Sequence, residues 1–488
     1  MSGSLILIII VTYFSVLLTV SYLTGRKTGN RTFFTADKQS RWYIIAFGMI
    51  GTSLSGVTFI SVPGMVRGID MTYMQMVLGF FVGYLFIANV LLPLYYRLNL
   101  TSIYTYLRER IGMRAYKTGA SFFLLSRTIG AAVRIYLVAL ILQAFVYDPW
   151  GIPFYVNVII NLLLIFIYTF RSGIKTIIWT DTLQALCMIT MLVLIIRQIS
   201  LHMNLDFNGI VQVVTTHEHS RIFVFDDWQS KQNFFKQFFS GIFITIVMTG
   251  LDQDMMQKNL TCRTLKEAKR NMYSYGFAFI PINFLFLTLG ILLLMLAQQT
   301  GTTLPESSDQ ILPLFATNGM LGTPVLVFFT LGIIAASFAS ADSAIAALTT
   351  SICIDILNID QYPAEKAKHI RIQTHFLITV LVVIIILVVK EINNKSVIDA
   401  IYTIAAYTYG PLLGLFAFGM LTKRMTRDRF TPYICIASPL LAYALDYTIQ
   451  RYTGYKFGYE ILMINGLITF AGLIFFSYDN KRGEIRYQ

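Results

Sequence analysis

Apolar runs of roughly 18 to 30 residues recur from one end of the chain to the other, separated by short polar segments. A helix of about this length crosses the hydrocarbon core of a bilayer. The first run has no basic leader and no small-residue cleavage site, so we interpret it as a spanning helix. The pattern predicts an all-α polytopic membrane protein with about thirteen transmembrane helices. Their expected ranges are about 4–24, 42–66, 71–97, 116–147, 154–170, 174–198, 233–257, 271–299, 322–357, 370–390, 396–422, 431–450 and 459–477.

Basic residues concentrate in alternate loops. Of the 38 lysines and arginines, 27 lie in the segments 25–41, 97–117, 171–175, 258–270, 358–371, 423–429 and 481–486. The positive-inside rule places these loops in the cytoplasm, with the N-terminus outside and the C-terminus inside. We expect a multi-pass protein of the cell (plasma) membrane, with the lipid bilayer as a partner.

Composition agrees with this class, because 56% of the residues are hydrophobic and 13% are charged. The net charge of +13 follows from the loop bias, and its scatter over many short loops argues against a nucleic-acid partner. The four cysteines lack CxxC spacing, and His217-Glu218-His219 has no third metal ligand nearby. We find no nucleophile–base pair, metal cluster or phosphate loop, so we do not expect an enzyme.

Two predicted spans contain helix-breaking residues. In the second span, glycines alternate with hydroxyl residues in FGMIGTSLSGVTFISVPG, and the eleventh span contains Gly410-Pro411. Carbonyl groups freed inside a membrane are tolerated only where they line a cavity or bind something. Either site is also compatible with a simple kink. Interrupted helices in comparable places of two halves indicate an inverted-repeat secondary carrier.

The predicted organisation follows from these halves. Residues 1–41 form an additional N-terminal transmembrane helix and the first cytoplasmic loop, and 42–198 form the first repeat. An extracellular loop spans 199–232, and the second repeat spans 233–422. Two additional C-terminal helices and a short cytoplasmic tail make up 423–488.

The ninth span carries polar groups at its middle. Ser337, Ser340 and Ser343 recur every three residues, and Asp342 lies beside them. A carboxylate at that depth costs about 2.5–3.5 kcal/mol on insertion scales. Hard oxygen ligands suit a small cation such as Na+. We therefore predict an ion or substrate pathway, although the serines alone are also typical of a small-residue packing seam.

Arg127 and Arg134 lie two helical turns apart in the fourth span and share one face. Arginine presents a planar fork that suits a carboxylate. We expect one of them to bind an anionic substrate group and the other to pair with an aspartate. The alternative is that both pair structurally with Asp181 or Asp342.

Five motifs, in order over about residues 30–430, resemble the sodium/solute symporter family. They are PLYYRLNLTSIYTYLRERIG (93–112), YTFRSGIKTIIWTDTLQ (168–184), DQDMMQKNLTCRTLKEAKR (252–270), AASFASADS and GPLLGLFAFGMLTKR. The resemblance implies a five-plus-five inverted-repeat core of the leucine-transporter type. It also implies alternating access driven by a sodium gradient.

The resemblance implies a Na+ site between the broken first core helix and the eighth. Carried over by position, its residues are Gly51, Leu54, Ala336, Ala339 and Ser340. Family members commonly have two adjacent hydroxyl residues where this chain has Ala339-Ser340, so one side-chain oxygen is missing. Some relatives hold a second Na+ at positions that correspond here to Asp181, Asp342 and Ser343. Two carboxylates so close favour a cation or a shared proton between them.

We therefore expect a sodium-coupled secondary active symporter that imports a small organic solute, such as a carboxylate or a sialic-acid-like anion. The expected substrate contacts are Ser53, Ser55, Thr58, Arg127, Arg134 and Tyr407. Alternatives are a sugar or polyol symporter, which Val77 disfavours because sugar carriers have a polar residue near that position, and a proton-coupled carrier. A non-transporting solute sensor is least expected. We expect Na+ and the solute as partners and a functional monomer.

Overall fold

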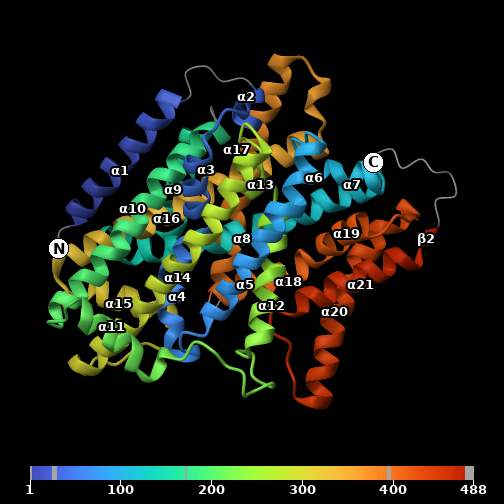
Figure 1. Ribbon diagram of the computed structural model, residues 1–488. Coiled ribbons are helices and arrows are strands. Elements are labelled where there is room, and N and C mark those ends of the chain that lie inside the picture. Colours follow the sequence, from blue (N-terminus) through green and yellow to red (C-terminus); the bar gives the residue numbers. More distant parts are fainter. Residues whose placement is uncertain (1–2, 25–29, 171–172, 393–396, 479–488) are drawn as a thin grey trace.

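The computed structural model describes residues 3–24, 30–170, 173–392 and 397–478, and within these ranges the chain is almost entirely helical (Figure 1). Each of the thirteen predicted spans coincides with helix. The predicted tail at 479–488 and parts of the basic loops, at 25–29 and 171–172, lie outside the described residues.

The helices of the first half follow α1 (Gly3–Thr24) and the short α2 (Asn30–Thr35). They are α3 (Trp42–Ser53), α4 (Gly56–Ile69), α5 (Tyr73–Phe86), η2 (Ile87–Leu91), α6 (Leu92–Arg97), α7 (Thr105–Arg110), α8 (Met113–Leu142), η3 (Gln143–Tyr147), α9 (Phe154–Thr169) and α10 (Ile174–His202). The segments η2 and η3 are π-helical turns that continue the helix before them. The loop expected at 199–232 contains a helix of its own, α11 (Phe207–Thr216).

A second series of helices follows. It comprises α12 (Phe234–Thr245), η6 (Ile246–Gly250), α13 (Gln253–Asn259), α14 (Leu265–Thr300), α15 (Ile311–Thr317), α16 (Gly322–Ser351), η8 (Ile352–Ile356), α17 (Ala364–Ile392), α18 (Val397–Thr408) and α19 (Gly410–Leu421). Two further helices, α20 (Thr431–Thr453) and α21 (Ile461–Phe475), follow. The strands β1 (Met425–Thr426) and β2 (Ser477–Tyr478) pair antiparallel beside them.

Six unbroken helices in the described part are long and apolar enough to cross a membrane, and nine spans result if each bent pair counts as one. The other predicted spans coincide with the shorter apolar helices Val11–Thr24, Phe154–Thr169 and Ile461–Phe475, and with α20. Many side chains on these helices are exposed and apolar, which suits contact with lipid. The chain is therefore a multi-pass membrane protein.

Both predicted helix breaks are present. The axes of α3 and α4 differ by 60° across Leu54 and Ser55, and those of α18 and α19 differ by 44° across Tyr409, next to Gly410. A third break was not predicted from the sequence. It separates η6 from α13 by 69°, where the Asp252 side chain caps α13 by accepting bonds from the Asp254 and Met255 amides. Within the predicted repeats 42–198 and 233–422, the α3–α4 and η6–α13 breaks each lie in the first span, whereas Gly410 lies in the last span of the second repeat.

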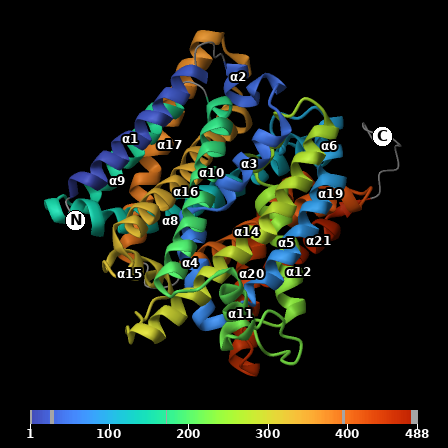
Figure 2. The same cartoon turned by 60° about the vertical axis from the view of Figure 1, so that its left-hand side comes forward.

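The most extensive helix contacts at the centre of the bundle involve five helices. The long α10 packs against α3 and α16, and α5 packs against α12. At the edges, α1 lies beside α9 on one side of the molecule, and α20 and α21 lie on the other (Figures 1 and 2). This arrangement brings the three helix breaks and the polar middle of α16 together in the core.

Candidate functional site

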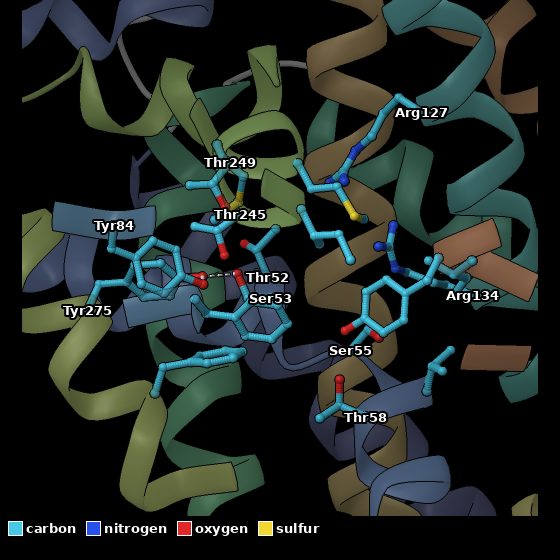
Figure 3. Close-up of a pocket in the computed structure, with 18 residues that line it drawn as sticks. Thr52, Ser53, Ser55, Thr58, Tyr84, Arg127, Arg134, Thr245, Thr249 and Tyr275 are labelled. Carbon is cyan, nitrogen blue, oxygen red and sulfur yellow. Dashed lines mark hydrogen bonds between the residues drawn. The ribbon is translucent and has the colours of Figure 1, made fainter. Parts of the chain in front are cut away.

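A cavity lies at the break between α3 and α4 (Figure 3). Its volume is about 90 Å³. Five of the six predicted substrate residues line it: Ser53, Ser55, Thr58, Arg127 and Arg134. The other lining residues are mainly aromatic or aliphatic, with threonines among them: Thr52, Val57, Phe80, Tyr84, Ile244, Thr245, Met248, Thr249, Met255, Tyr275, Phe279, Ile401 and Tyr402. A few convergent polar groups on an apolar wall are typical of a small-molecule site.

The two walls of the cavity differ in chemistry. Figure 3 shows Arg127 and Arg134 on one side and Tyr84 and Tyr275 on the other, with the hydroxyl residues of the helix break between them. The Tyr275 hydroxyl shares hydrogen bonds with Ser53 Oγ at 2.6 Å and with the Tyr84 hydroxyl at 2.9 Å. One side can therefore attract an anion, and the opposite side offers ring faces and hydroxyl groups.

Tyr407, the sixth predicted substrate residue, lies elsewhere. Its hydroxyl is 3.5 Å from Asp446 Oδ2 on α20, and its ring packs near Tyr443. Tyr402, on the same helix, lines the cavity instead and shares a 2.9 Å hydrogen bond with Tyr73. Five residues of helix rotate a side chain by about 140° from its starting direction, so the two tyrosines face different neighbours.

The two arginines have different surroundings. Arg127 forms an ion pair and a hydrogen bond with Asp254, and its second nitrogen is 3.9 Å from Asp252 Oδ2. The prediction of an arginine–aspartate pair is met here by aspartates of α13, rather than by Asp181 or Asp342. Within the described part of the chain, Arg134 has no hydrogen-bond or ion-pair partner, although it borders the cavity.

The predicted Na+ site joins the helix break to α16. Among the described residues, no backbone or side-chain donor bonds to the carbonyl oxygen of Gly51 or Leu54. The reason is that α3 ends at Ser53, so the amide groups four residues further on do not continue its hydrogen-bond ladder. Helix α16 packs against both α3 and α4, and its residues Ala336, Ala339 and Ser340 are buried. The Ser340 hydroxyl donates to the Ser337 carbonyl at 3.0 Å, which leaves its oxygen lone pairs available. Free carbonyls and a hydroxyl are the ligand types that Na+ prefers.

The predicted second cation site holds a network of protein groups. Asp181 accepts a 2.9 Å hydrogen bond from Thr52 Oγ1, and Lys258 Nζ lies 2.5 Å from the same carboxylate oxygen. Asp342 accepts from the Tyr168 hydroxyl at 2.8 Å and from the Ser343 amide at 2.5 Å. The Ser343 hydroxyl donates to Asp254 Oδ1 at 2.6 Å.

Three residues of this network, Asp252, Asp254 and Lys258, were not singled out from the sequence. We counted Lys258 among the cytoplasmic basic residues, whereas the structure buries it completely on α13. Two features of the sequence could have identified them. Asp252 stands where it can cap a helix, and Asp254 and Lys258 have the i, i+4 spacing of an ion pair on one helix. Together the network contains four buried carboxylates and two buried cations: Asp181, Asp252, Asp254, Asp342, Arg127 and Lys258.

A broken helix pair beside a polar cavity inside a multi-pass bundle defines a membrane carrier of small solutes. The profile described as "Sodium:solute symporter family" matches residues 33–428, and the chain belongs to this family. It is therefore a sodium-coupled symporter of small organic solutes, a transporter and not an enzyme. Na+ is its coupling ion.

Several individual proteins are similar over most of their length. The chain is 27% identical to the sodium/sialic acid symporter NanT of Aliivibrio fischeri, over 86% of this chain and 84% of that protein. It is 26% identical to the sodium/sialic acid symporter SiaT of Proteus mirabilis, over 84% and 83%. It is 27% identical to the sodium-dependent multivitamin transporter of Oryctolagus cuniculus, over 83% and 65%.

Solved structures support the fold. A Na+-coupled sialic acid symporter in a substrate-bound outward-open state superposes with a TM-score of 0.83 at 22% identity, covering 96% of this chain and 97% of that one. Mhp1, a nucleobase-cation-symport-1 family transporter in a closed conformation, gives a TM-score of 0.59 at 12% identity, covering 92% and 94%. These likenesses establish the leucine-transporter-type arrangement of the helices.

Proposed function

We propose that this symporter imports a small organic carboxylate, of the sialic-acid-like kind, together with Na+. The observation that carries the proposal is the difference between the two cavity arginines. Arg127 is paired with Asp254, whereas Arg134 borders the cavity without an acceptor among the residues that the structure describes. A guanidinium in a membrane interior needs an anionic partner, and a carboxylate fits its planar fork.

The remainder of the cavity supports a solute with both apolar and hydroxyl-bearing parts. Figure 3 shows Ser55 and Thr58 on the side of Arg134. The rings of Phe80 and Phe279 also line the cavity, and Phe279 packs against the rings of Tyr84 and Tyr275. The similarity of this chain to two sodium/sialic acid symporters also supports a ligand of the sialic-acid-like class. A sugar or polyol would leave Arg134 without a counter-charge, and this makes the carboxylate the better fit.

Na+ binds, in this proposal, between the carbonyls of Gly51 and Leu54 and the α16 residues Ala336, Ala339 and Ser340. The bound ion would hold the broken helix against α16 and so organise Ser53, Ser55 and Thr58 for the solute. By linkage the solute then tightens Na+ binding by the same factor. Alternating access follows from rocking one half of the core against the other around this site.

We propose that the protein lies in the plasma membrane and crosses it thirteen times. Its N-terminus is then outside the cell and its C-terminus is in the cytoplasm. The inverted repeats are 42–198 and 233–422, flanked by one helix before and two after, and the unit of transport is the monomer. The bias of basic residues toward alternate loops supports this orientation.

A thermal-shift experiment tests the proposed function. Purified protein is heated with N-acetylneuraminic acid and a panel of small monocarboxylates, each beside its methyl ester, in sodium chloride or choline chloride. A carboxylate substrate should raise the melting temperature more in sodium than in choline, because it binds only the folded state and is linked to Na+. Its ester should not.

The matched variants are Arg134→Gln in the cavity and Arg197→Gln on the exposed face of α10. Arg134→Gln should remove the carboxylate's effect, and Arg197→Gln should retain it. Equal stabilisation by acid and ester, or an Arg134→Gln protein that still responds to the acid, would refute the carboxylate proposal.

A further inference from the structure

Lys258 places an ammonium group where the sequence predicts a second Na+. Its Nζ atom is 2.5 Å from Asp181 Oδ2 and 3.9 Å from Asp254 Oδ1, and it also donates to Thr52 Oγ1. The predicted ligand Ser343 donates its hydroxyl to the same oxygen of Asp254. Of the three predicted ligands, Asp181 therefore contacts a side-chain cation directly, and Ser343 is connected to that cation through Asp254.

This ammonium group is fixed in the protein interior. Lys258 is completely buried, and its carbonyl accepts a 2.6 Å hydrogen bond from Thr261 Oγ1. The adjacent Gln257 anchors α13 by donating to the Phe34 carbonyl at 2.7 Å. Unlike a bound ion, a tethered cation in such a position cannot exchange with the solution on either side of the membrane.

We propose that Lys258 is a permanent cation in place of a second Na+, so that one Na+ accompanies each solute. The inference rests on the proposed function, because the single transported ion is the one at the Gly51–Ser340 site. A second Na+ beside Asp181 would face the ammonium group at close range in a weakly screened interior, and like charges repel there. The carboxylates gain their counter-charge from the chain itself.

The consequence concerns the charge moved in each cycle. One Na+ with one monovalent carboxylate carries no net charge across the membrane, whereas two Na+ would carry one positive charge. Only the second stoichiometry couples transport to the membrane potential. Lys258 would therefore determine whether voltage contributes to accumulation of the solute.

Equilibrium binding of ²²Na+ to the purified full-length protein tests the inference without knowledge of the solute. The unmodified protein should bind one Na+ per chain, and Ser340→Ala should weaken that binding about tenfold. Lys258→Met should bind two, because the ammonium is gone while Asp181 and Asp254 remain. Lys258→Arg keeps the charge and should bind one, as should Lys266→Met, which removes an exposed lysine from the start of α14.

Two Na+ per unmodified chain, or one Na+ per folded Lys258→Met chain, would overturn the inference. No Na+ bound to the unmodified protein would instead refute the proposed Na+ site. Where Lys258→Met is too unstable for binding studies, its melting temperature is followed across a series of Na+ concentrations. Sodium should then stabilise Lys258→Met more than the unmodified protein, and an equal effect on both would again overturn the inference.

Discussion

Arg127 is ion-paired with Asp254 across the core of the bundle, from the middle of α8 to the short helix α13. Both side chains are buried, and Asp254 also accepts a hydrogen bond from Ser343 of α16. The pair thus connects three helices that meet at the cavity. Asp252, capping the same short helix, accepts a 2.6 Å hydrogen bond from Tyr409 at the α18–α19 break, so two of the helix breaks are linked through one network.

Arg127→Met and Arg134→Met should have opposite signatures. Removing one partner of a buried ion pair costs about 3–5 kcal/mol, so Arg127→Met should melt at a lower temperature even without solute. Among the described residues, no acceptor is paired with Arg134, so Arg134→Met should melt like the unmodified protein. Loss of its charged hydrogen bonds to a carboxylate, at about 1.5–3 kcal/mol, should raise the KM for solute uptake roughly 10- to 100-fold.

Melting curves without solute and uptake into proteoliposomes measure the two effects separately. The double variant Arg127→Met/Asp254→Asn removes the pair as a unit and should recover part of the stability that Arg127→Met loses. If Arg134→Met were destabilised and kept a normal KM, Arg134 would have a structural role and the proposed substrate role would be wrong.

Ser340→Ala should raise the Na+ concentration that gives half-maximal uptake by about tenfold, equivalent to about 1.4 kcal/mol at one ligand oxygen. The reason is that Ala336 and Ala339 offer only backbone oxygens on the α16 side of the proposed site. At subsaturating Na+ the apparent affinity for solute should fall as well, since the two ligands are linked. Uptake rates measured over a sodium–choline series give both values.

Thr330→Val is the control for that measurement. Thr330 lies on the same helix, and its hydroxyl donates at 2.7 Å to the Leu326 carbonyl within α16. Its removal should leave the Na+ dependence unchanged. Identical sodium curves for Ser340→Ala and Thr330→Val would place the ion elsewhere.

The interior helices and the main break could be predicted because they leave local signals. Apolar runs indicate spans whatever they pack against, and the alternation of glycine and hydroxyl residues near Leu54 identifies an unwound segment. The break at Leu251 and Asp252 escaped prediction because the preceding residues continue an apolar helix without interruption. Its local marks are Gly250 and the cap formed by Asp252, and a single glycine or a single aspartate before a helix is a common feature.

The ion-pair network could not be predicted for a different reason. Hydropathy treats each residue alone, so Lys258 at the end of an apolar run resembles any basic loop residue. Its burial depends on Thr52 and Asp181, which lie 206 and 77 positions away in the chain. Likewise, the sequence does not show which of the four aspartates of the network pairs with Arg127. The packing of α8 against the rest of the core brings Arg127 to Asp254.

Gly79 and Gly241 allow α5 and α12 to approach closely, and neither tolerates a larger residue. A Cβ atom on Gly79 would lie 2.1 Å from the Phe238 carbonyl oxygen, and one on Gly241 would lie 2.3 Å from that of Met76. Small residues at such contacts are typical of membrane helix interfaces. Gly79→Ala or Gly241→Ala should separate the helices and lower the melting temperature, with a cost of about 1–3 kcal/mol.

Gly68→Ala provides the comparison, since a Cβ at that helical position has no described neighbour within 4 Å. It should melt at or slightly above the temperature of the unmodified protein, because alanine favours the helix. Tolerance of alanine at Gly79 and Gly241 would mean that the α5–α12 contact is looser than described.

Asn465, a buried residue of α21, supports the bend between α18 and α19. Its amide nitrogen donates to the carbonyls of Ala406 at 3.1 Å and Tyr407 at 2.8 Å. Pro411 has no N–H, so the carbonyl of Tyr407 loses its usual partner four residues later in the chain. A side chain of α21 therefore supplies the donors that the interrupted helix lacks, and a buried carbonyl without one costs about 1–3 kcal/mol.

Asn465→Ala should consequently lower the melting temperature, while Asn208→Ala, on the exposed surface of α11, should not. The bend connects Tyr402, which lines the cavity, to Tyr409, which holds Asp252. Asn465→Ala should therefore also slow uptake at saturating Na+ and solute, because the break is less well held as the core rocks. Normal stability together with normal maximal uptake would show that water, and not Asn465, satisfies these carbonyls in the membrane.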